Sequence, residues 1–367
     1  MILFFLASLS LLAYSFFPII KRGIYLLDFA LFYHPVGKLL SQNLNPYQST
    51  TPLLYSPPML LLLYPLNFLP LTPSQLIWTT LSFLSLLLGL WLIIKTTSLK
   101  PSLYWFLLIS PFFFLSFPAK FTLGMGQINH FVLLFFTLSF YLYQKKRLQF
   151  SALFLTLAFL SKFFPLWVLV FFVFKKDHQF LKNLTLYSLS AFAITALLLP
   201  FKITKDFFIT VMPSFFNHTH NSSYYNQALT GLISRSIQNS TYQTYTAIVL
   251  TLLLLILTLR KIKTLSASFQ FSLLITLSLL TAPVAWQHHL VFLFFPLITL
   301  LAKFLKTKQY PQLSLLLFSY LLIFINLKTP PIPDSFLNQL FLSHATLGSL
   351  IIFFLHFNRK SQTLKKS

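Results

Sequence analysis

The sequence is poor in the residues on which soluble folds and thiol chemistry depend. Its 367 residues include no cysteine and no glutamate, and only 8% are charged. The absence of cysteine excludes disulfides and thiolate catalysis. Soluble domains carry about 25% charged residues, so a soluble fold is excluded as well. Carboxylate side chains are limited to four aspartates, Asp28, Asp177, Asp206 and Asp334.

The abundant residues are apolar. Hydrophobic residues make up 56% of the chain, and 46 residues are phenylalanine. This composition predicts an all-α protein that crosses a membrane many times. The net charge is +23, but the basic residues lie in short clusters between apolar runs. That arrangement is typical of membrane topology and of contact with anionic lipid, and it argues against a nucleic-acid surface.

Twelve apolar segments are candidates for membrane helices. They are Met1–Ile20, Leu71–Ile94, Leu103–Phe117, Ile128–Tyr143, Leu148–Leu160, Phe163–Phe174, Leu184–Leu199, Thr244–Leu259, Leu265–Ala282, Leu290–Leu305, Gln312–Leu327 and Leu340–Phe357. The first is interpreted as an anchor and not as a cleaved signal, because no basic residue precedes it. The fifth and sixth are too short to cross, since about 13 helical residues cover about 20 Å of a hydrocarbon core of about 30 Å. They predict a helical hairpin with Lys162 near its tip, where a lysine snorkels or binds an anion.

Lysine and arginine orient these segments. With both termini in the cytoplasm, 18 of the 27 basic residues lie on the inner side. They occupy positions 95–100, 145–147, 175–182, 260–263, 303–308 and 359–366. Lys21 and Arg22 oppose this topology locally, but the whole distribution favours it. The unusual polar residues then gather at outer ends, so a site is expected to face outward.

The stretch 28–69 follows the first apolar segment and has a pattern of its own. Apolar residues recur at helical spacing over Phe29–Leu44, which predicts a helix on the membrane surface. Pro46 ends that helix. The pair Pro57-Pro58 forms a stiff turn that begins a second short helix, Met59–Phe68. The result is an acid at a membrane boundary, followed by two interfacial helices and a clamp rich in aromatic residues and proline.

Four motifs occur in order along the chain. They are Asp28-Phe29 with Tyr33, Asn45-Pro46-Tyr47, Tyr55-Ser56-Pro57-Pro58, Pro65 and Leu69-Pro70; then Gly124-Met125-Gly126-Gln127-Ile128-Asn129; then Leu153–Pro165, ending in Lys-x-x-Pro; and then Thr281–His289, a form of Ser-Pro-x-x-Trp-x-x-His. Together they resemble glycosyltransferase family 87, over about residues 25–300. The chain departs from that pattern at Asn43-Leu44-Asn45, where the family usually has a glycine before Pro-Tyr, and in its phenylalanines near Lys162.

The resemblance implies the GT-C glycosyltransferase fold. Residues 1–200 would form a transmembrane module with a large external loop at 21–70, residues 201–243 a second external loop, and residues 244–367 further transmembrane helices. It also implies an inverting, metal-independent transfer of a hexose, expected to be mannose, from a β-linked polyprenyl phosphate to a glycan or glycolipid acceptor. The lipid-linked sugar is a co-substrate, no cofactor is expected, and the site would face outward from the cytoplasmic membrane.

The resemblance assigns the two central roles to ionisable residues. Asp28 would be the catalytic base that takes the proton of the acceptor hydroxyl. The residues alone leave open a helix cap or a partner for Lys21 or Arg22. Lys162 would neutralise the donor phosphate as it leaves, with ordinary snorkelling as the alternative.

Further residues are expected to bind the donor or the sugar. Gln127 and Asn129 lie where Gly126 lets backbone approach a ligand and a helix begins, although a flexible turn with an amide cap is the alternative. His289 or the adjacent His288 would bind the phosphate or sugar and Trp286 would stack on a sugar, or these residues anchor the chain at the membrane interface. The remaining candidates are Lys120 and Arg235 for the phosphate, and Tyr33, Tyr47, Tyr55 and Pro57 for the substrate.

Other functions stay open at this point. His218 and His220 are two residues apart, but no acid lies close to them, so a metal site is not expected. A related transferase could use another polyprenyl-phosphate sugar, which donor competition would reveal. A lipid or solute transporter would need ionisable residues near the centres of its long segments, and these are almost absent. An inactive assembly partner is disfavoured by the presence of Asp28.

Overall fold

The computed structural model describes residues 1–21, 25–48, 53–162, 167–217, 220–327 and 336–358. Every regular element within those ranges is a helix, and the one β-bridge there pairs single residues, Asn226 and Trp286. The prediction of an all-helical protein is therefore confirmed. A helix satisfies its backbone hydrogen bonds within its own segment, which a chain of this apolar composition requires in lipid.

Four helical stretches are long and apolar enough to span a membrane. They are α4 (Leu71–Lys95), α10 (His178–Leu198), α14 (Ser240–Ile262) and the continuous stretch Gln287–Lys306. The helices α5 (Ser102–Phe114) and α6 (Phe117–Met125) form a fifth candidate if a pair bent by 67° is one span. Shorter apolar helices accompany them, so the structure supports a membrane protein and does not confirm twelve crossings.

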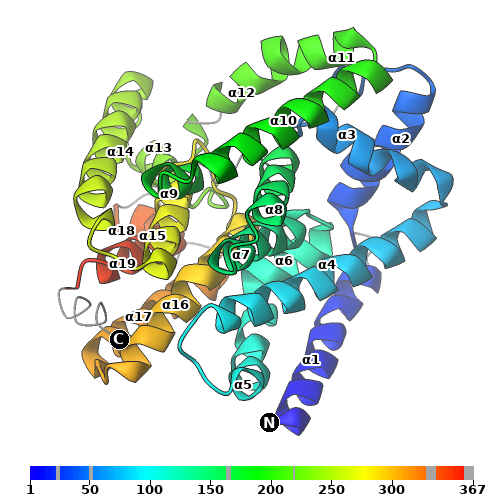
Figure 1. Ribbon diagram of the computed structural model, residues 1–367. Coiled ribbons are helices and arrows are strands. Elements are labelled where there is room, and N and C mark those ends of the chain that lie inside the picture. Colours follow the sequence, from blue (N-terminus) through cyan, green and yellow to red (C-terminus); the bar gives the residue numbers. More distant parts are fainter. Residues whose placement is uncertain (22–24, 49–52, 163–166, 218–219, 328–335, 359–367) are drawn as a thin grey trace.

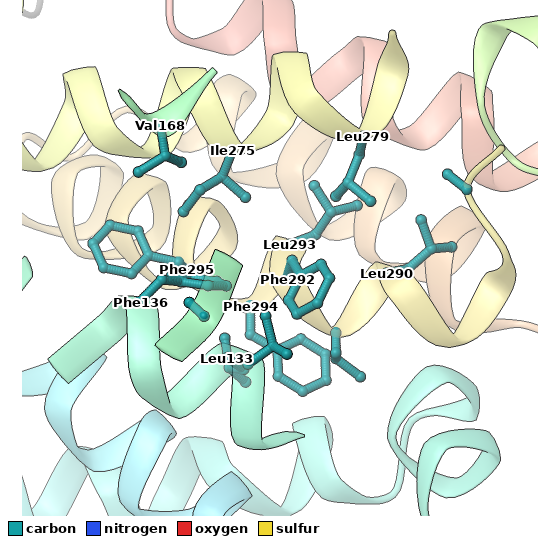
Figure 2. Close-up of a cluster of buried hydrophobic side chains, with 14 of the residues drawn as sticks. Leu133, Phe136, Val168, Ile275, Leu279, Leu290, Phe292, Leu293, Phe294 and Phe295 are labelled. Atoms are coloured by element: carbon teal, nitrogen blue, oxygen red, sulfur yellow. The ribbon is translucent and has the colours of Figure 1, made fainter. Parts of the chain in front are cut away.

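The core of the protein is formed by helices from the middle and the second half of the chain. Figure 2 shows phenylalanine, leucine, isoleucine and valine side chains packed together there. They come from α7 (Asn129–Gln144), α9 (Val168–Phe174), α15 (Ala267–Leu280), the 3₁₀ helix η6 (Gln287–Leu293) and α16 (Phe294–Lys306). Every residue of α15 from Gln270 to Leu280 is buried. By contrast, α10 and α14 at the periphery keep most of their apolar side chains exposed, as lipid-facing helices do (Figure 1).

The first external segment folds into more pieces than its sequence pattern predicts. The expected helix Phe29–Leu44 is a π-helical turn, η1 (Phe29–Tyr33), followed by α2 (His34–Ser41). It ends earlier because Asn43 adopts a positive φ of 55°. The prediction that Pro57 or Pro58 begins a helix is confirmed, because α3 (Pro57–Leu63) starts at Pro57 and continues as η3 (Tyr64–Phe68). Between them, η2 (Pro46–Gln48) is a single 3₁₀ turn.

The two short segments form separate helices, as expected. They are α8 (Leu148–Ser161) and α9, and α8 packs against α7 and α10. Lys162 follows directly after the last residue of α8. The rest of the expected hairpin tip, residues 163–166, lies outside the described residues.

The second expected loop, 201–243, is largely helical in its described part. It contains α11 (Phe201–Asp206), η4 (Phe207–Val211), α12 (Met212–Asn217) and α13 (Leu229–Ser236). The polar composition hid these short helices. The remaining elements are α1 (Ile2–Lys21), α17 (Tyr310–Phe324), α18 (Phe336–Leu342) and α19 (His344–Leu355).

Candidate functional site

The centre of the site is the tight junction between α6 and α7. Gly126 ends α6 with a φ of 73°, a conformation that side chains rarely adopt. A Cβ added there would lie 2.6 Å from the Cβ of Phe29, so only glycine fits. The junction is held by a bond of 2.9 Å from the Gln127 N–H to the Thr122 carbonyl and by the Trp78 indole, which donates to the Gly126 carbonyl at 2.8 Å. Gln127 and Asn129 are thereby fixed on a rigid turn.

Gln127 brings this junction to Asp28, which lies 99 positions earlier in the chain. Its Nε2 donates a hydrogen bond to Oδ2 of Asp28. Asp28 directly precedes η1 and is partly buried. Burial raises the pKa of this carboxyl, while the Gln127 hydrogen bond and the nearby Lys162 charge act to lower it. A carboxylate with a raised pKa is a better proton acceptor, which suits a general base.

Two tyrosines approach the oxygen of the Gln127 amide, and a third supports one of them. Tyr33 donates to Gln127 Oε1 at 3.0 Å, the hydroxyls of Tyr33 and Tyr55 hydrogen-bond one another, and Tyr55 approaches the same Oε1 at 3.4 Å. Tyr47 donates to the backbone carbonyl of Tyr55 at 2.6 Å. Burial raises the pKa of all three phenols, so they act as neutral hydrogen-bonding groups. Three of the expected substrate contacts thus support the residue that holds Asp28.

Lys162 binds the second amide of the junction, Asn129. Its Nζ donates to Oδ1 of Asn129 at 2.8 Å, and it interacts electrostatically with Asp28. Burial lowers the pKa of Lys162 to about 7, against a smaller opposing effect of Asp28. Burial leaves the charged ammonium poorly solvated, so a bound anion would stabilise it.

The two adjacent histidines lie close to this lysine. His288 and His289 are both buried at the start of η6, and the Lys162 charge acts on both rings. The backbone carbonyl of His288 accepts bonds of 3.2 Å from Thr122 and from Asn129. The structure therefore brings the Gly-Gln-x-Asn motif, Lys162 and the histidine motif together.

Three further candidates lie around this centre. Pro57 is buried as the first residue of α3, and Trp286 and Lys120 are partly exposed. Trp286 directly precedes η6, and its backbone carbonyl accepts the His289 N–H at 2.7 Å. Lys120 lies on α6, which packs against η6.

Arg235 is bound elsewhere. Its guanidinium donates to Oγ of Ser343 at 2.7 and 3.2 Å, and to the carbonyls of Ser223 and Asn226 at 2.7 and 3.0 Å. Burial lowers its pKa to about 10. These bonds join α13 to residues 223–226 and to the junction of α18 and α19. Its position points to a structural link.

Two residues that were not among the candidate site residues complete the framework. Thr122 holds both the junction and the His288 carbonyl. Ser56 donates to the carbonyl of Leu160, two positions before Lys162, and so ties the turn before α3 to the end of α8. Ser56 precedes two prolines, which is the pattern of a helix start; nothing in the sequence distinguishes Thr122.

The histidine pair considered for metal is only partly described. His218 lies outside the described residues, and His220 Nδ1 contacts Oε1 of Gln243 at 2.6 Å. Within the described ranges, no three histidine or aspartate side chains cluster as metal ligands.

A carboxylate, a lysine and buried polar side chains from distant parts of the chain therefore meet at the α6–α7 junction of a helical protein with several apolar helices. The sequence profile of glycosyltransferase family 87 matches residues 53–283, more than half of the chain, so the protein belongs to this family and is a glycosyltransferase. No curated protein and no solved structure matches the chain significantly. Asp28, His288 and His289 lie outside the matched range, but within it Gln127 hydrogen-bonds Asp28 and Asn129 hydrogen-bonds the His288 carbonyl.

Proposed function

We propose that the protein transfers a hexose, expected to be mannose, from a polyprenyl-phosphate carrier to a glycan or glycolipid acceptor. The observation that carries the proposal is the convergence of Asp28 and Lys162 on the α6–α7 junction. A base and a cation with a lowered pKa are the two groups that this single displacement requires. The proposed donor is the lipid-linked sugar and not a nucleotide sugar. The GT-C glycosyltransferase fold is the fold expected for a protein with this reaction.

The reaction proceeds in one step. The acceptor hydroxyl attacks the anomeric carbon of the β-linked donor, and Asp28 takes the hydroxyl proton. The bond between the anomeric carbon and the phosphate oxygen breaks, and its electron pair leaves with the polyprenyl phosphate. The configuration inverts, so the product is an α-glycoside.

Lys162 assists this step by neutralising the negative charge that grows on the phosphate. Such a charge is stabilised most by donors that are already oriented and partly shielded from water. Asn129 holds the lysine, and His288 and His289 lie close enough to contribute to phosphate binding. Because phosphate is a good leaving group, no second carboxylic acid is required.

The orientation of the protein follows from the same proposal. The inner loops carry most of the lysine and arginine, so the site would face outward from the cytoplasmic membrane with both termini inside. The acceptor would then be a lipid-linked or cell-envelope glycan on the outer face.

The test uses the purified protein in nanodiscs with radiolabelled polyprenyl-phosphate mannose and a mixture of glycolipid acceptors. Unlabelled polyprenyl-phosphate glucose and arabinose serve as competitors. We expect label to move to a glycolipid and mannose to compete best. Label movement across the bilayer without glycoside formation would indicate a transporter and contradict the proposal. If another polyprenyl-phosphate sugar competes more strongly than mannose, the reaction type stands and that sugar replaces mannose as the proposed donor sugar.

A further inference from the structure

Gln127 is held at both ends of its side-chain amide. Oε1 accepts from Tyr33 at 3.0 Å, and Nε2 donates to Asp28. Only 9% of Gln127 and 1% of Tyr33 is exposed, so little room is left for a substrate between these groups. The sequence pattern placed Gln127, Tyr33 and Tyr55 among the substrate contacts, but their polar atoms contact one another.

The direction of this chain of hydrogen bonds is fixed by chemistry. An ionised carboxylate only accepts hydrogen bonds, so the NH₂ group of Gln127 must face Asp28 and its oxygen must face the tyrosines. Each phenol has one proton to donate. Tyr33 gives its proton to Gln127, so Tyr55 donates to Tyr33.

The tyrosines are themselves immobilised. The ring of Tyr33 packs against the rings of Phe29 at 6.4 Å and Trp78 at 5.3 Å. The backbone of Tyr55 is tied by the hydroxyl of Tyr47 at 2.6 Å. The amide of Gln127 therefore has one orientation, and that orientation fixes Oδ2 of Asp28.

We propose that Gln127 is a positioning residue that anchors one oxygen of Asp28 and leaves Oδ1 to take the proton of the acceptor hydroxyl. No hydrogen bond to Oδ1 occurs among the described residues. The inference rests on the proposed role of Asp28 as the base.

The neighbouring amide explains why the base and the cation stay separate. Oδ1 of Asn129 accepts a hydrogen bond of 2.8 Å from the Lys162 ammonium, while Nε2 of Gln127 donates a hydrogen bond to Asp28. A direct ion pair between Asp28 and Lys162 would stabilise the carboxylate and reduce its basicity, and it would occupy the charge that the phosphate needs. Two neutral amides, two positions apart, orient both groups without neutralising them.

The experiment compares Gln127→Ala, Gln127→Glu, Tyr33→Phe and Asp28→Asn in the nanodisc transfer assay, with kcat, donor KM and the pH profile of kcat as readouts. Tyr320→Phe is the matched control, because it removes a tyrosine hydrogen bond of 2.6 Å to the Phe112 carbonyl far from the site. Thermal unfolding and donor binding confirm that each variant is folded.

We expect Gln127→Ala to lower kcat about 100-fold with donor KM within threefold of wild type, as loss of alignment does. Tyr33→Phe lowers kcat about 10-fold, because Gln127 keeps its bond to Asp28 but loses the partner that orients it. Gln127→Glu places a second carboxylate beside Asp28, so the acid limb of the pH profile moves up by about one pH unit or more. A merely structural change would leave that limb in place.

The outcomes separate this inference from the proposed function. If Asp28→Asn is inactive and Gln127→Ala keeps the wild-type kcat, the positioning role is wrong and the base is retained. If Gln127→Ala raises donor KM with kcat unchanged, Gln127 binds substrate and the inference is again overturned. Transfer by Asp28→Asn at the wild-type rate would overturn the proposed function itself. If Gln127→Ala does not fold, the kcat of Tyr33→Phe and the acid limb of Gln127→Glu test the positioning role instead, and wild-type values for both would overturn it.

Discussion

Donor binding should take up a proton at Lys162, and replacing this lysine by arginine should abolish the uptake. In the empty site the pKa of Lys162 is about 7, so about half of the molecules carry a neutral amine at neutral pH. A phosphate at about 4 Å contributes about 4 kcal/mol at an effective dielectric of about 20, which also describes buried sites. That energy corresponds to about 3 pKa units, which raises the pKa in the complex to about 10.

The sign follows from which form binds. The charged lysine binds the phosphate, so donor affinity is full below the pKa of the empty site and falls as the pH rises above it. Between pH 6 and pH 9 we expect the dissociation constant of the donor to rise about 100-fold, with about half a proton taken up at pH 7. Above the pKa of the complex the dependence ends.

Isothermal titration calorimetry in buffers of different ionisation enthalpy measures both quantities. Lys162→Arg retains the charge but does not titrate in this range. Its donor affinity should be nearly constant over the same pH range, while titration of Asp28 remains as in wild type. Lys162→Met should bind weakly at every pH. Equal pH dependence of wild type and Lys162→Arg, with no proton uptake, would refute the reasoning.

Two further predictions concern stability. Gly126→Ala should lower the free energy of unfolding by about 1–3 kcal/mol and lower transfer activity, because the φ of 73° and the contact with Phe29 are both incompatible with a Cβ. Gly89→Ala is the control, because the added Cβ would lie 3.6 Å from its nearest neighbour. Equal melting temperatures for the two variants would contradict the account. Arg235→Ala should lower the melting temperature, since it removes the bonds to Ser343 and to two carbonyls, but leave donor affinity within about twofold. If Arg235→Ala instead loses donor affinity and keeps its melting temperature, Arg235 binds the donor phosphate and is not a structural link.

Much of the fold could be predicted from apolar composition, because a chain of this kind must satisfy its backbone hydrogen bonds by forming helices. The positions of the main apolar helices followed from run length. The break of the first external helix at Asn43 and the short helices of 201–236 did not, because they depend on local φ values and packing and not on periodicity. A count of crossings needs the direction of each short helix relative to the membrane, which hydropathy does not contain.

The candidate site divides in the same way. Asp28, Gln127, Asn129 and Lys162 were found because they stand in motifs, and the structure joins them across 99 and 33 positions. Which of them contacts which could not be predicted, since the hydrogen bonds arise only when α6, α7, α8 and η1 are packed. The role of Thr122 could not be predicted from the sequence, because a threonine inside an apolar helix is common.

The most direct test of the central claim is transfer of label from polyprenyl-phosphate mannose by wild type and Asp28→Asn in nanodiscs. Asparagine has nearly the same shape and can still accept the Gln127 hydrogen bond, so folding and donor binding should be retained. Asp177→Asn is the matched control, because Asp177 caps α10 through the Phe180 N–H at 3.1 Å. The account predicts a labelled glycolipid with wild type and Asp177→Asn, and none with Asp28→Asn. Turnover of Asp28→Asn at the wild-type rate would contradict it.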